Sequence, residues 1–183
     1  MELLSETEEV ETGVYYDRND YAGFFARMLI LAIDTVVVLV LSAAAVVAYV
    51  YAKYPAPPDD RSIFLVVAIV WYAYMAGLKA TRFGTLGYKL TGYRLVNLKG
   101  ETPSLARTSA RLMFLIVGPL HPILDLIWLG GERDRQTLRD KWAATYVVRK
   151  DARPAGAGPI EFDRMFLFAW SILVRTVGRG KRK

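Results

Sequence analysis

The most constraining feature of this chain is a long apolar run over residues 28–51, in which Asp34 is the one charged residue. The run exceeds the ~20 residues that an α-helix needs to cross the hydrocarbon core of a bilayer. An acid at such a place costs at least ~2.5–3.5 kcal/mol on insertion scales, and it therefore usually marks a function or a buried partner. Arg27 lies one heptad earlier and shares a helix face with Asp34, because seven steps of about 100° return nearly to the start. We therefore predict a membrane helix that carries an ionisable stripe.

Composition supports an integral membrane protein of one domain. The chain has 183 residues, of which 54% are hydrophobic, and no cysteine, which excludes disulfides and thiolate metal sites. The net charge of +6 comes from basic residues between and after the apolar runs, where the positive-inside rule would put them. We therefore expect no nucleic-acid partner. The residues before the first run are acidic rather than basic, so we expect that run to be a mature helix and not a signal peptide.

A second apolar run over residues 62–78 carries no charge and is just long enough to span. The turn before it contains Pro55, Pro57 and Pro58, so the two runs predict an antiparallel transmembrane hairpin. The following segment, residues 79–111, contains seven basic residues and one acid. By the positive-inside rule this loop is cytoplasmic, and two crossings then place the N-terminus on the same side. The prediction is a multi-pass protein of the cell membrane.

The third apolar run, residues 112–129, is interrupted by Gly118-Pro119 and Pro122. A full span would place the basic C-terminal third of the chain outside, against the positive-inside rule. A broken or re-entrant segment would return the chain to the cytoplasm, because prolines are tolerated where the freed carbonyls face protein or a cavity. Two short segments, Tyr93–Asn97 and Thr145–Arg149, read as β-strands whose pairing requires both on one side. We favour re-entry.

The expected fold is an all-α membrane protein with the transmembrane hairpin, the broken or re-entrant third segment, a small cytoplasmic β element and a C-terminal interfacial helix over residues 162–177. Residues 1–20 are expected to be an acidic mobile leader, residues 21–150 the membrane domain, and residues 151–183 a linker, the interfacial helix and a polybasic tail. The basic residues of the tail suit the headgroups of anionic lipids. They are Arg175, Arg179, Lys181, Arg182 and Lys183.

Three stretches together resemble the RDD family of small membrane proteins, named for one arginine and two aspartates. They are YAGFFARMLILAID, with Arg27 and Asp34; the loop GTLGYKLTGYRLVNLKGETPSLARTSAR; and RQTLRDKWAATYVV, with Asp140. The resemblance covers roughly residues 20–150. Arg139 stands where many relatives have histidine, and Ala144 where a glycine is common. The resemblance implies a polytopic membrane protein, and some members of the family are suspected of exchanging cations for protons.

Asp34 is the strongest candidate site, and we place it about a third of the way into the hydrocarbon. It either couples to a proton or a cation, or it is a carboxylate locked to a partner that holds helices together. For Arg27 three roles are open. It either pairs with Asp140 as a latch that docks residues 131–150 beneath the helices, takes part in transport, or anchors the helix at the headgroups.

Asp125 and His121 lie four residues apart in the third run and would share a helix face. With Asp34 they would line an ion or proton pathway; the alternative is a histidine and an aspartate satisfied near a kink. The loop Gly84–Gly92 lacks the spacing of a phosphate-binding P-loop, and no catalytic motif is present. We expect no enzyme, cofactor or metal.

The leading hypothesis is therefore transport of a cation or a proton, with Asp34 as the coupling group. The alternative is a non-transporting membrane scaffold or accessory subunit in which the charged triad is architectural. In either case we expect a homo-oligomer or another membrane protein as partner, since three segments are few for a transport path.

Overall fold

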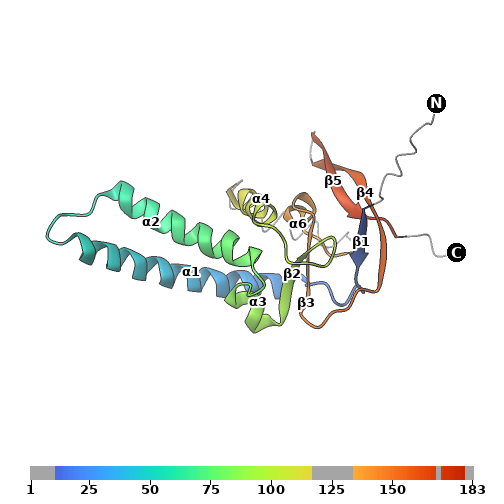
Figure 1. Cartoon of the computed structure of the whole chain (residues 1–183), viewed down its shortest axis with the longest axis horizontal. Coiled ribbons are helices and arrows are strands. Elements are labelled where there is room, and N and C mark those ends of the chain that lie inside the picture. The colour runs from blue at the N-terminus through green and yellow to red at the C-terminus, as the bar shows by residue number, and fades with distance from the viewer. Residues whose placement is uncertain (1–10, 117–133, 168–169, 180–183) are drawn as a thin grey trace, which may run out of the picture.

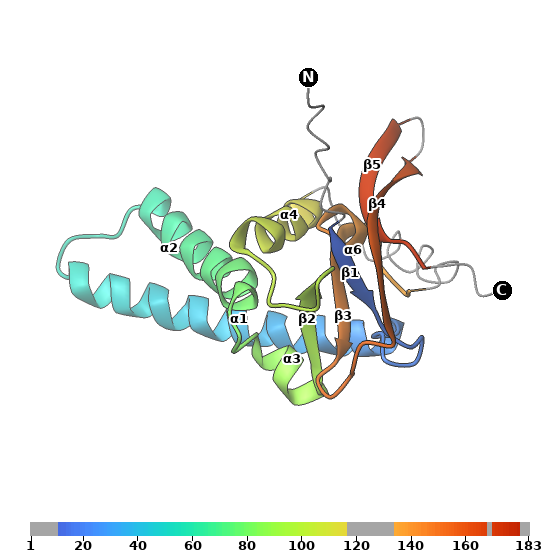
Figure 2. The same cartoon turned by 45° about the vertical axis from the view of Figure 1, so that its right-hand side comes forward.

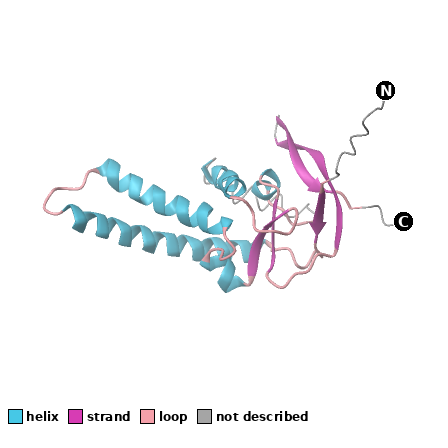
Figure 3. Cartoon of the chain, in the orientation of Figure 1, coloured by secondary structure: helices cyan, strands magenta, loops and turns pink. Residues whose placement is uncertain are grey.

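The computed structural model describes residues 11–116, 134–167 and 170–179 of an elongated molecule (Figure 1). A hairpin of two helices extends from one end, and the strands and short helices gather at the other end (Figure 3). We call this second part the body. The body holds the start of the first long helix, as both views show (Figures 1 and 2).

The hairpin consists of α1 (Phe24–Lys53) and α2 (Asp60–Tyr72). Asp59 caps α2, because its carboxylate accepts a hydrogen bond from the backbone N of Ser62 at 2.8 Å. Beyond α2 the helix continues as a π-helical turn, Ala73–Gly77, and a 3₁₀ turn, Leu78–Ala80. The two apolar runs thus form the two antiparallel helices that the sequence predicts.

Both arms of the hairpin expose their apolar side chains. In the part of the chain that the structure describes, Phe24–Lys53 and Asp60–Ala80 are long and apolar enough to cross a membrane. Within their most apolar stretches only 22% and 17% of the residues are buried. The core helix of a soluble protein would be mostly buried, whereas Leu39, Val40 and Ile69 face outward here. A large exposed apolar surface of this kind marks a region that contacts a membrane or another protein.

The body contains an antiparallel pair, β2 (Tyr93–Asn97) and β3 (Thr145–Arg149), with Tyr93 opposite Arg149 and Asn97 opposite Thr145. Both predicted strands and their pairing are confirmed. Three helices accompany the pair: α3 (Leu86–Thr91), α4 (Leu105–Ile116) and α6 (Leu138–Trp142). Because β2 and β3 belong to one sheet, the chain before and after the third apolar run lies on the same side of any bilayer that the hairpin crosses.

A second antiparallel sheet has the strand order β1–β4–β5 and contains β1 (Thr12–Tyr15), β4 (Gly156–Leu167) and β5 (Trp170–Val177). It packs on the first sheet through a buried aromatic cluster. The rings of Tyr16, Tyr21 and Tyr146 meet edge to face, with centroids 5.5–6.4 Å apart. Pairs of this geometry stabilise a core beyond the area that they bury.

The prediction of an all-α fold is wrong, because the described residues contain two antiparallel sheets beside the helices. The predicted interfacial helix over residues 162–177 is wrong for the same reason: that segment belongs to the β4–β5 hairpin, with Ile160 opposite Val177 and Leu167 opposite Trp170. Some of its apolar side chains pack on protein, while Phe162 and Leu173 are exposed. Met165 and Val174 cover Leu138 of α6.

Two other expectations meet the structure only in part. Residues 12–15 of the acidic leader form β1, which pairs with β4, and Tyr16 is buried in the body. A mobile leader therefore cannot extend to residue 20, and residues 1–10 lie outside the described residues. In the third apolar run, residues 112–116 belong to α4. The broken or re-entrant segment itself falls on residues 117–129, which also lie outside the described residues.

Candidate functional site

Asp34 lies fully buried at the junction of the hairpin and the body, where both its carboxylate oxygens are engaged. Its Oδ1 accepts hydrogen bonds from the Tyr74 hydroxyl at 3.1 Å and from the backbone N of Gly87 at 2.9 Å. Its Oδ2 accepts one from Thr85 Oγ1 at 2.8 Å and forms an ion pair with Lys79 Nζ at 3.4 Å. The carboxylate therefore ties α1 to the end of α2 and to the start of α3.

Local structure positions each of these partners. The π-helical turn after α2 buries Tyr74, whose hydroxyl also accepts a hydrogen bond from the backbone N of Leu86 at 3.1 Å. Thr85 occupies the N-cap position of α3, but its side chain donates to Asp34 instead of capping the helix. Gly87 permits the approach of α3 to α1, because a Cβ there would lie 2.6 Å from Asp34 Oδ1. We call these residues (Asp34, Tyr74, Lys79, Thr85 and Gly87) the Asp34 cluster.

The Asp34 cluster marks one end of the uncharged stretches of the hairpin. In α1 an uncharged stretch begins after Asp34, and the uncharged stretch that starts in α2 ends before Lys79, in the 3₁₀ turn. The ion pair between these two residues shows that both stretches end at one level. The apolar surface of α1 continues on the other side of Asp34, where Phe25 and Leu29 are exposed, so the depth of Asp34 in a bilayer stays a prediction.

A second buried carboxylate, Asp140, lies in α6 between two arginines from other elements. Arg27 Nη1 of α1 lies 2.5 Å from Asp140 Oδ2, and Arg111 of α4 forms an ion pair with Oδ1. Arg27 also donates to the carbonyl of Ala22 at 3.0 Å and to that of Arg135 at 2.9 Å. The latch between Arg27 and Asp140 that the sequence raised as one of three alternatives is thus the observed geometry.

Asp140 is held in place by its own helix start. Thr137 and Asp140 form a capping box in which each side chain accepts a hydrogen bond from the other's backbone N. Burial raises the pKa of the Asp140 carboxyl, but the charges of Arg111, Arg27 and Arg139 outweigh it and hold the pKa below its usual range. The carboxylate is therefore ionised at neutral pH.

The structure separates the three signature residues into two neighbouring sites. Asp34 belongs to one cluster, while Arg27 and Asp140 belong to the other. A small cavity of about 30 Å³ between them is lined by Arg27 and Lys79, among other residues, and has room for about one water molecule. The sequence reasoning missed the partners of Asp34 and the second arginine of Asp140, although Lys79 and Arg111 each stand at the edge of an apolar run.

The other predicted site residues contribute little to this junction. His121 and Asp125 lie outside the described residues, as do Lys181, Arg182 and Lys183 of the polybasic tail. Arg175 forms an ion pair with Glu11. Arg179 pairs with Asp134 and lies over the ring of Tyr15 at 4.5 Å. Both described arginines of the tail thus contact the protein itself, and the described residues contain no group of three or more acidic or histidine side chains placed to hold a metal ion.

A long, outwardly apolar helical hairpin fixed to a small body by buried ion pairs defines a membrane-anchored protein. The sequence model of the RDD family matches residues 21–144. The chain belongs to the RDD family, and the family together with the two apolar helices indicates a membrane protein. No curated protein and no solved structure gives a significant match.

Proposed function

We propose that the protein is a non-transporting membrane scaffold or accessory subunit, in which the buried carboxylates fix the body against the membrane hairpin. The observation that carries this proposal is the complete engagement of Asp34. A carboxylate offers about four lone-pair sites, and four donors from Tyr74, Lys79, Thr85 and Gly87 occupy them. No site remains for a transported ion.

In this proposal the hairpin crosses the cell membrane twice. Residues 79–111, which carry seven basic residues, lie in the cytoplasm by the positive-inside rule, and the body and the N-terminus lie there too. The exposed apolar faces of α1 and α2 support lateral association with a second copy or with another membrane protein. The body then provides the surface that a soluble partner would meet.

Transport of a cation or a proton is the second candidate, and the Asp34–Lys79 pair favours it. At 3.4 Å the ammonium is the most distant of the four donors, and Lys79 also lines the small cavity beside Arg27. A cation could enter by displacing Lys79. The path onward would need walls from other subunits, because α1 and α2 alone enclose no channel.

A flux assay separates the two proposals. The protein and its Asp34→Asn variant would be reconstituted in liposomes, with proton and Na⁺ movement followed by trapped dyes. Asp60→Asn, at the exposed first position of α2, is the matched control. The scaffold proposal expects no flux above that of protein-free liposomes and a lower unfolding temperature for Asp34→Asn. Flux that only Asp34→Asn abolishes, in a variant that unfolds at the parent's temperature, would establish transport instead.

A further inference from the structure

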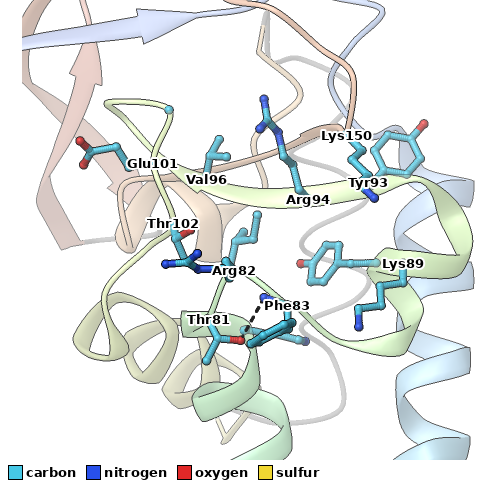
Figure 4. Close-up of a pocket in the computed structure, with 15 residues that line it drawn as sticks. Thr81, Arg82, Phe83, Lys89, Tyr93, Arg94, Val96, Glu101, Thr102 and Lys150 are labelled. Atoms are coloured by element: carbon cyan, nitrogen blue, oxygen red, sulfur yellow. Dashed lines mark hydrogen bonds between the residues drawn. The ribbon is translucent and has the colours of Figure 1, made fainter.

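A cleft of about 740 Å³ lies beside the hairpin–body junction. It lies between the end of α2, the loop of residues 81–85, α3 and β2 (Figure 4). Its size is within the range of clefts that hold small molecules. The cleft is a separate space from the Asp34 and Asp140 sites. Lys79 lines the cleft and also lines the small cavity between those two sites.

Positive charge dominates the lining of the cleft. Five basic residues line it, against the single acid Glu101. They are Lys79, Arg82, Lys89, Arg94 and Lys150. The ammonium of Lys79 is held by Asp34, and Arg94 donates to the carbonyl of Ala152 at 3.0 Å.

Three of these cations remain available to a ligand. Arg82, Lys89 and Lys150 are exposed, and within the described part of the chain no ion pair joins them to a carboxylate. Figure 4 shows that Arg82, Lys89 and Arg94 come from three different parts of the chain and that the side chain of Arg94 points away from the other two. A cleft of this charge attracts an anion.

The position of the cleft adds an apolar requirement. The backbone N of Gly87 donates to Asp34, so α3 lies at the level where the uncharged stretches of the hairpin end. At this level Phe83, Leu86 and Leu90 are 66%, 47% and 68% exposed. Lys89 lies over the ring of Phe83 at 5.8 Å from its centroid. Apolar and aromatic side chains beside basic ones are typical of segments at the membrane interface.

We propose that this cleft binds the phosphate headgroup of an anionic phospholipid from the leaflet that faces the body. Arg82 and Lys89 contact the phosphate, while Phe83 lies against the glycerol and the first carbons of the acyl chains. Basic clusters that directly follow a membrane helix recognise anionic headgroups in this way. The site goes beyond the scaffold role and holds equally for a transporter, since it depends only on the membrane placement of the hairpin.

The test measures binding of single lipids to the full-length protein in a non-ionic detergent by native mass spectrometry. The probes are phosphatidylglycerol, phosphatidylcholine and inorganic phosphate. The cleft variant is Arg82→Gln/Lys89→Gln, and the matched control is Arg153→Gln/Arg164→Gln, which also removes two exposed positive charges but lies outside the cleft. Thermal unfolding of each variant shows that it is folded.

We expect the first phosphatidylglycerol to bind more tightly than phosphatidylcholine in the parent and in the control. The cleft variant should lose about thirtyfold in the phosphatidylglycerol binding constant, from ~1 kcal/mol for each basic residue near the surface. Equal binding of phosphatidylglycerol by the cleft variant and the control would overturn the proposal. Displacement of the bound lipid by an equal concentration of inorganic phosphate would also overturn it, because the cleft would then be a site for a free anion.

Discussion

Replacing Gly87 with alanine should loosen the junction between the hairpin and the body. The added Cβ would lie 2.6 Å from Asp34 Oδ1 and 2.6 Å from the carbonyl oxygen of Ile30, both closer than real Cβ contacts allow. Since α1 is a continuous helix, α3 must move away from it. Overpacking of this kind costs ~1–3 kcal/mol, and loss of the hydrogen bond from Gly87 N to a charged acceptor costs a further ~1.5–3 kcal/mol.

Alanine recovers up to ~1 kcal/mol through its higher helix propensity. The expected net loss is therefore about 3 kcal/mol in the free energy of unfolding, or about 6–12 °C in the unfolding temperature of a chain of this size. Thermal unfolding in detergent measures it. Gly77→Ala is the control, because Gly77 has helical backbone angles and nothing lies within 4 Å of its Cβ position. If both variants unfolded at the same temperature, the close approach of α3 to Asp34 would be refuted.

Four further outcomes follow from the same junction. Asp140→Asn should cost ~3–5 kcal/mol, because it leaves the buried guanidinium groups of Arg27 and Arg111 without their carboxylate. Arg27→Gln should cost less, because Asp140 keeps Arg111 as a partner, and in the double variant the cost should fall short of the sum by at least about 1 kcal/mol. The pKa of Asp140 is lower in the folded protein than in the unfolded chain. The stability that this difference contributes is present above the unfolded pKa of about 4 and is lost as the pH falls through the folded value. Unfolding temperatures between pH 7 and pH 3 should therefore decline more steeply in the parent than in Asp140→Asn. Thr85→Val should cost ~1.5–3 kcal/mol through the lost hydrogen bond to Asp34, and denaturant titration would measure it. Ala144 adopts φ +51°, a left-handed conformation that disfavours residues with a Cβ, so Ala144→Gly should raise stability by about 1 kcal/mol; an unchanged denaturation midpoint would refute that reasoning.

The hairpin and the β2–β3 pair could be predicted because local patterns determine them. Apolar runs long enough to span, separated by three prolines, permit only two antiparallel helices. Tyr93–Asn97 and Thr145–Arg149 are short, rich in β-branched or aromatic residues, and bounded by turns. Their pairing is the long-range part of the prediction; it was read from the two strand-like segments and agreed with the charge rule in placing both on one side.

The β4–β5 hairpin was missed because a continuous apolar run has no helical or strand period of its own. Residues 165–174 are uncharged, which favoured a helix at the membrane surface. The signal that pointed the other way was alternation in β5, where Ile172, Val174 and Thr176 are β-branched and lie on one face of the strand. The strand structure also depends on contacts with distant parts of the chain: Met165 and Val174 pack on Leu138, and β4 pairs with β1.

The candidate site was half predictable. An acid within an apolar run and an arginine at its edge are visible in the sequence, as is Asp140 through the family resemblance. The partners of Asp34 are not visible, because Thr85 and Gly87 reach it only through the docking of α3 on α1, a contact between segments 51 or more residues apart. Ala144 is an exception: its departure from the family's glycine was noticed in the sequence, and the structure gives the position a left-handed backbone.

The central claim, that buried carboxylates fix the hairpin to the body, is tested most directly by an electron spin resonance distance measurement. The chain has no cysteine, so Ile69→Cys in α2 and Phe162→Cys in β4, both exposed positions, would carry the only two spin labels. Our account predicts a single narrow distance distribution in the parent and in an Asp60→Ala control, and broad distributions in Asp34→Ala and Asp140→Ala. Narrow and unchanged distributions in both of these variants would contradict it.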